Sequence, residues 1–134
     1  MWNSDIATDA QGSASLLGVA LTMVAVVLGV LIADIGVLLR ARSEAATAAD
    51  AAALAAAPLT FHGSGASPGE QAARYAAING ATLLSCACRV DPTWATRTVT
   101  VVVAISVDPL LTGPVEVAVS SRAEFVPTDQ YFDG

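Results

Sequence analysis

Residues 13–33 read SASLLGVALTMVAVVLGVLIA, an apolar run without a charged residue or a proline. At a rise of about 1.5 Å per residue, a helix over this run is about 30 Å long, which matches the hydrocarbon core of a bilayer. Asp34 interrupts the run, and IGVLL then extends it to Arg40 and Arg42. We therefore predict a membrane-spanning helix over residues 14–39.

A secretory signal peptide is the main alternative for this segment. Such a peptide has a basic leader and an apolar region of about 7–15 residues. Here the polar leader, residues 1–12 (MWNSDIATDAQG), carries Asp5 and Asp9 but no basic residue, and the apolar run is longer. We therefore expect the segment to be an anchor.

The overall composition limits the functions that the chain can have. It has 134 residues, 54 % of them hydrophobic and 13 % charged, with a net charge of −6. An acidic chain is a poor partner for nucleic acid, because neutralising phosphates requires a basic surface. No catalytic pair, metal-ligand set or phosphate-binding loop stands out. We predict a protein that is not an enzyme and has no cofactor, no metal and no small-molecule substrate.

Small residues recur along the apolar run at spacings of three and four, which places them on one side of a helix. In lipid, small residues let helix backbones approach closely, so this side is a candidate packing face. The alternative is that glycine and alanine are merely common in membrane helices. The candidate packing face is Gly18, Thr22, Ala25, Gly29, Ala33 and Gly36, and the side expected to meet lipid is Leu17, Leu21, Val24, Leu28, Leu31 and Leu38.

Asp34 is the one acid within the apolar stretch. A charge at the bilayer centre costs about 2.5–3.5 kcal/mol on insertion scales, so the interface is its expected position. Two interpretations are open. Asp34 pairs with a basic group on a partner helix, or it is an interfacial carboxylate that is hydrated or near Arg40.

The helix is expected to continue beyond the span. After Arg40 the sequence ARSEAATAADAAALAAAPL contains no helix breaker before Pro58, and alanine has the best helix propensity. We predict one helix over residues 13–57, about 65 Å long. Residues 58–69 (PLTFHGSGASPG) are expected to form a loop, in which His62 is a solvated side chain rather than a metal ligand.

Residues 58–134 are expected to form a small α+β head packed on residues 41–57. A second helix is predicted from Glu70 to about Ser85, with Ala73, Ala76, Ala77, Leu83 and Leu84 on its apolar side. The alternative is that Asn79-Gly80 ends this helix early. Alternating residues predict two antiparallel strands, 98–107 and 115–125, joined by DPLLTGP, and a short strand over 88–90 adds a third. Leu110 and Leu111 are expected either to be exposed at the turn, as a contact site, or to fold back onto the core.

The two cysteines form the sequence Cys86-Ala87-Cys88. Their spacing is outside the usual geometry of a disulfide unless the backbone bends. Free thiols, a disulfide within or between chains, and a metal site therefore stay open as alternatives.

GSASLLGVAL followed by DIGVLLRARSEAATAADAAALAAA resembles the TadE/TadG-like family of tight-adherence (Flp) pilus assembly proteins, most of all its short actinobacterial branch found beside secretion genes. The resemblance implies a pilin-like plan, with a long helix half in lipid and half in a small head that faces away from the cytoplasm. The two arginines after the span favour the opposite topology by the positive-inside rule. Prepilin processing expects Glu at the fifth mature position. A cut after Gly12 would put Leu17 there, so we expect no processing.

The sequence thus predicts a single-pass, pilin-like assembly subunit of the minor pseudopilin type in a cell-surface pilus or related secretion system. Its expected partners are the membrane and, through the transmembrane helix, other subunits. A membrane-anchored extracytoplasmic binding module is the alternative, in which the helix is only a tether.

Overall fold

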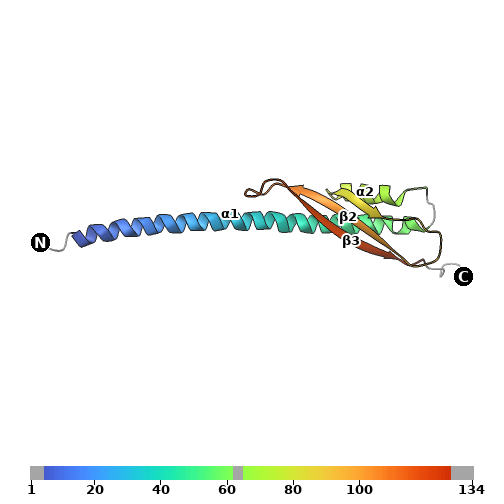
Figure 1. Cartoon of the computed structure of the whole chain (residues 1–134), viewed down its shortest axis with the longest axis horizontal. Helices are drawn as coiled ribbons and strands as arrows, with labels where there is room; N and C mark the ends of the chain where they lie inside the picture. Colours follow the sequence, from blue (N-terminus) through green and yellow to red (C-terminus); the bar gives the residue numbers. More distant parts are fainter. Residues whose placement is uncertain (1–4, 62–64, 128–134) are drawn as a thin grey trace. The chain divides into compact units, whose positions relative to one another are not determined.

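The computed structural model describes residues 5–61 and 65–127, so His62 lies outside the described residues. The chain divides into two compact units, Met1–Gly36 and Val37–Gly134. The elements, in chain order, are α1 (Asp5–Ala56), the short 3-10 helix η1 (Pro58–Thr60), α2 (Pro68–Ile78), β1 (Thr82–Ala87), β2 (Arg97–Val107) and β3 (Val115–Phe125) (Figure 1). The predicted α+β class, with a long N-terminal helix, a second helix and an antiparallel sheet, is confirmed.

The first unit is the N-terminal part of α1. The apolar side chains of this part are exposed, for example Leu17 at 66 % and Ile32 at 70 %. The helix is long and apolar enough to cross a membrane. It begins at Asp5, earlier than the expected start at Ser13. No proline lies between these positions, so the sequence contains no helix breaker that would prevent the earlier start.

The second unit is built on a stripe of fully buried alanines along the C-terminal part of α1. These side chains form a core with Val99, Val101 and Val103 of β2 and with Ala72 and Ala76 of α2. In Figure 1 the strands cross this part of α1 diagonally. A methyl group adds little height to a helix surface, so a sheet of valines can pack closely against the backbone. We call this set the alanine stripe: Ala45, Ala48, Ala49, Ala52, Ala53, Ala56 and Ala57.

The sheet is a three-stranded antiparallel meander in the order β1-β2-β3. β2 and β3 pair along their whole length, from Arg97 opposite Phe125 to Val107 opposite Val115. The alternation predicted for these two strands is confirmed at Val99, Val101 and Val103 of β2, which are buried, and along β3, where every second residue is exposed. Ala104, expected on the other side of β2, is buried as well. At the turn, Leu110 is 80 % and Leu111 58 % exposed, so their side chains do not fold back onto the core.

The prediction for residues 70–90 was partly wrong. α2 ends at Ile78, and Leu83 and Leu84 lie in β1, which replaces the strand expected over 88–90. The helix ends in a Schellman motif: Gly80 has φ 76°, its N–H donates to the carbonyl of Ala77 at 3.0 Å, and the N–H of Ala81 donates to that of Ala76 at 2.9 Å.

The buried side of α2 agrees with the expected apolar side at Ala76 but not at Ala73 and Ala77. Ala72 and Ala76 are fully buried, whereas Ala73 and Ala77 are exposed. Because α2 ends at Ile78, Leu83 and Leu84 are not part of it and do not determine which side is buried. The buried side is instead the one that carries Ala72 and Ala76, which are four residues apart.

Arg97, the first residue of β2, links this strand to η1, the short helix that follows α1. Its guanidinium donates to the carbonyl of Thr60 at 2.9 Å and to that of Ala95 at 3.1 Å, and it also contacts the carbonyls of Asp91 and Thr93. Its Cζ lies 5.5 Å from the centre of the Phe61 ring. A planar cation with several donors can satisfy carbonyls from two segments at once, so it holds the β1–β2 connection against η1.

We expect Ala76→Leu to lower the free energy of unfolding by about 1–3 kcal/mol, because the added atoms overpack a fully buried site. Ala77→Leu is the matched control: it makes the same change one residue along, at an exposed position, and should change stability by less than about 0.5 kcal/mol. Urea unfolding of the detergent-solubilised full chain, followed by circular dichroism, measures both. Equal losses would contradict the observed packing of α2.

We expect the pKa of Asp91 to lie below the ordinary aspartate value of about 3.9. The backbone N–H of Thr93 donates to Asp91 Oδ1 at 2.9 Å and stabilises the carboxylate, with smaller contributions from the Thr93 hydroxyl and nearby arginines. The resulting stabilisation is present above the unfolded-state pKa and is lost as the pH falls through the lower folded-state pKa.

An NMR titration of the Asp91 carboxyl carbon measures this pKa. Thr93→Pro removes the donor N–H and should raise the Asp91 pKa toward its ordinary value, whereas Thr93→Ala keeps that N–H and should raise it less. A titration in which the proline variant matches the parent chain would show that the backbone hydrogen bond is not the main cause.

Candidate helix-packing site

The candidate packing face lies along the exposed part of α1. All of its six residues, from Gly18 to Gly36, are exposed. A Cβ atom built on Gly18, Gly29 or Gly36 would meet no atom within 4 Å. Contacts within the described part of the chain therefore do not require glycine at these positions, and each site has room for a backbone of another helix.

Thr22 is the one polar residue of this face. Its hydroxyl donates to the carbonyl of Gly18, one turn earlier, at 2.9 Å. A threonine hydroxyl in this arrangement is satisfied within its own helix. The face is thus apolar and presents small groups, which suits packing through van der Waals contact rather than through hydrogen bonds between helices.

The side expected to meet lipid is exposed as well, with Leu21 at 62 %, Leu28 at 52 % and Leu31 at 42 %. Because both sides of α1 are open here, burial does not distinguish a packing side from a lipid side. The assignment of the two sides therefore rests on side-chain size and stays a prediction.

Asp34 differs from its neighbours, because it is only 7 % exposed whereas Ile35 is 56 % exposed. Its side chain is thus largely shielded in the structure. Pairing with a basic group on a partner helix and an interfacial position, hydrated or near Arg40, both stay predictions.

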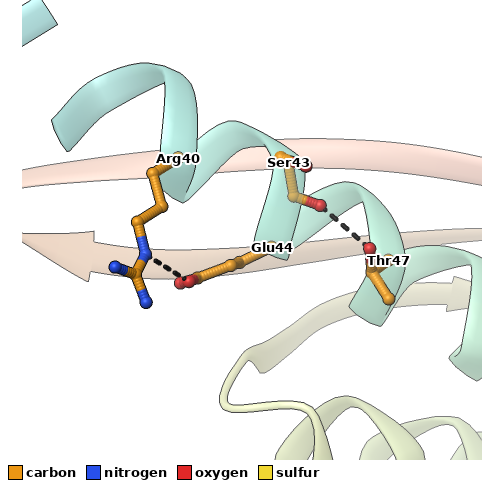
Figure 2. A network of polar contacts seen from close by, with 4 residues as sticks. All are labelled: Arg40, Ser43, Glu44 and Thr47. Atoms are coloured by element: carbon orange, nitrogen blue, oxygen red, sulfur yellow. Dashed lines mark hydrogen bonds and ion pairs between the residues drawn. The ribbon is translucent and has the colours of Figure 1, made fainter. Parts of the chain in front are cut away.

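Arg40 forms an ion pair with Glu44, one turn further along α1, with 2.8 Å between Nε and Oε1 (Figure 2). The hydrogen bond and the charge of Glu44 raise the pKa of the Arg40 guanidinium. In the next turn the Thr47 hydroxyl donates to the Ser43 carbonyl at 3.1 Å. Sequence analysis overlooked Glu44, although its spacing of four from Arg40 is the signal of such a pair.

Asp50 links α1 to β3, because its carboxylate accepts a hydrogen bond from the Ser121 hydroxyl. The two residues are 71 positions apart in the sequence. No local pattern predicts a contact at that separation. This hydrogen bond helps to fix the position of β3 along the helix.

Cys86 and Cys88 share one side of the strand end, and both pack against the core. The structure joins them in a disulfide, with their Cα atoms 5.2 Å apart. This distance is within the usual range for disulfides and is shorter than the spacing of alternate residues in a flat strand. The backbone bend that a bridge between such close residues needs is therefore present here.

Metal binding has no support among the residues that the structure describes. Over 5–61 and 65–127, no three histidine, cysteine, aspartate or glutamate side chains are grouped so as to hold a metal ion.

Comparison with known proteins gives one match. Residues 12–58, about a third of the chain, match a family model named Tad and described as "Putative Flp pilus-assembly TadE/G-like". Searches of curated proteins and of solved structures found no match. The matched residues include the whole candidate packing face and the alanine stripe up to Ala57. The resemblance seen in the sequence is therefore confirmed over residues 12–58, which are similar to the TadE/G-like Flp pilus-assembly family.

Proposed function

We propose that this protein is a single-pass, pilin-like assembly subunit of the minor pseudopilin type, working in a tight-adherence pilus or a related secretion system. The family match and the apolar N-terminal helix fit a pilus-related membrane subunit. The proposal goes further, because it assigns the association with other subunits to the candidate packing face. No catalytic step is part of this function.

One observation carries the assignment: three glycines on a single side of α1 have open space where a side chain would be. A helix that only tethers a head needs no such side. For a subunit that packs against other helices in lipid, missing side chains allow close contact between backbones, and hence many weak contacts at once.

We propose further that the head faces away from the cytoplasm and that the leader is not cleaved after Gly12. The family resemblance supports this topology, whereas Arg40 and Arg42 oppose it. The positive-inside rule weakens when the translocated segment is longer than about 60 residues, and the segment after Arg42 exceeds that length.

Gly29→Leu is expected to reduce association several-fold while leaving membrane insertion intact. Leucine is favourable at the centre of a membrane helix, so insertion is retained, but its side chain separates the backbones. The open space at Gly29 means that the change causes no clash within the chain. Chemical cross-linking in membranes, at equal protein levels, measures the effect.

Val24→Leu is the control for this test, because it adds volume to the side expected to meet lipid and should associate like the parent chain. If Gly29→Leu associates as well as Val24→Leu, the small residues do not form an interface and only reflect the usual composition of membrane helices. The anchored binding module would then replace the assembly subunit as the better proposal.

For the topology, we expect a reporter that is active only outside the cytoplasm to be active when fused after Gly134. A second fusion at the same position, with a reporter active only in the cytoplasm, should be silent. The opposite pair of results would mean that the two arginines determine the orientation. The mass of the purified chain shows at the same time whether residues 1–12 are retained.

A further inference from the structure

The turn between β2 and β3 presents two leucines at its apex. The N–H of Gly113 donates to the carbonyl of Pro109 at 3.2 Å and closes the turn, and Gly113 has φ 68°, a conformation that favours glycine. The side chains of Leu110 and Leu111 are 80 % and 58 % exposed. No charged residue lies between Asp108 and Glu116. We call residues 109–113 the apolar apex.

The position of the apolar apex within the second unit follows from the contacts at the other end of β2. There, the carbonyl of Thr60 accepts hydrogen bonds from the N–H of Asp91 at 2.8 Å and from the Arg97 guanidinium at 2.9 Å. These contacts hold the start of β2 beside the residues that follow α1. Figure 1 shows the β2–β3 turn at the opposite end of the sheet from the end of α1.

The length of β2, compared with the rise of α1, shows which residues of α1 lie at the level of the β2–β3 turn. From Arg97 to Val107, β2 rises by about 33 Å. A helix covers the same distance in about 22 residues, and counting back from Thr60 leads to the turn of α1 that precedes Arg40. The diagonal crossing shortens this reach somewhat. The apolar apex therefore lies at about the level of the first turns of α1 in the second unit, which contain Arg40 and Arg42.

These two arginines follow directly on the apolar run, and both are exposed. Arginines at the end of a membrane helix lie at the level of the lipid headgroups. We propose that the apolar apex inserts Leu110 and Leu111 into the interfacial region of the bilayer that α1 spans. This inference depends on the membrane-spanning helix in the proposed function, but not on assembly or on which side the head faces.

A lipid surface fits the apolar apex better than a protein partner does. Two adjacent leucines on a narrow turn bury little area, and the apex lacks the aromatic or arginine anchors that are typical of protein interfaces. A lipid interface takes up isolated apolar side chains without any shape complementarity. It is also continuous with the surface that α1 already contacts in the proposed function.

Tryptophan reporters in the full chain test this proposal. In a background of Trp2→Phe and Trp94→Phe, three single variants are made: Leu110→Trp at the apex, Leu31→Trp within the span and Leu54→Trp as the control. Leu54 is 67 % exposed on α1 and lies about 20 Å beyond Arg40. Each variant is reconstituted into phosphatidylcholine vesicles, with and without lipids brominated in the acyl chains. Leu111→Trp serves as a second apex reporter.

We expect brominated lipid to reduce the emission of Leu110→Trp and Leu31→Trp at least about twofold and to leave that of Leu54→Trp unchanged, since quenching requires contact with the acyl chains. If Leu31→Trp is quenched while both apex reporters behave like Leu54→Trp, the proposal is overturned and the span stands. If Leu31→Trp is not quenched either, the span fails, and the proposal fails with it. Equal quenching at Leu54 would also overturn it, because the contact would not be specific to the apex.

Discussion

The close contact between the alanine stripe of α1 and the valines of β2 determines the rest of the second unit. Because the stripe has only methyl groups, the sheet lies near the helix backbone, and a larger side chain at any of these positions would force the two apart. The polar contacts are arranged around this core. Arg97 holds one end of β2 at Thr60, and Asp50 holds β3 at Ser121.

A single helix, α1, thus combines two kinds of surface. Before Gly36 one side of α1 has large, apolar and exposed side chains, as is typical of a helix in lipid. Beyond Val37 one side is reduced to alanine and is covered by the strands of the second unit. The ion pair between Arg40 and Glu44 lies near this change, where exposed charged residues first replace the leucines and valines. The family model matches both kinds of surface, but it does not reach the sheet.

The parts of the fold that could be predicted from sequence are those with a clear period or an uninterrupted composition. The apolar run, the alanine-rich continuation and the alternation in β2 and β3 each specify a surface locally. Residues 79–90 were harder, because Leu83 and Leu84 suit a helix as well as a strand. The Asn79-Gly80 turn decided the outcome. The contacts of Arg97 and the pairing of Asp50 with Ser121 join distant segments, so no local pattern predicts them. The candidate packing face was identified from spacing alone and stays a prediction, since any helix that packs on it would lie outside this chain.

The alanine stripe also has a consequence for entropy. On burial, a leucine or isoleucine loses rotamer freedom worth about 0.5–1 kcal/mol, whereas alanine has no rotamers to lose. Each buried alanine therefore contributes less hydrophobic free energy than a buried leucine would. In return, the helix side of the contact loses almost no side-chain entropy when the sheet packs on it. Once α1 is helical, its side of this contact therefore needs no further ordering of side chains when the strands pack against it.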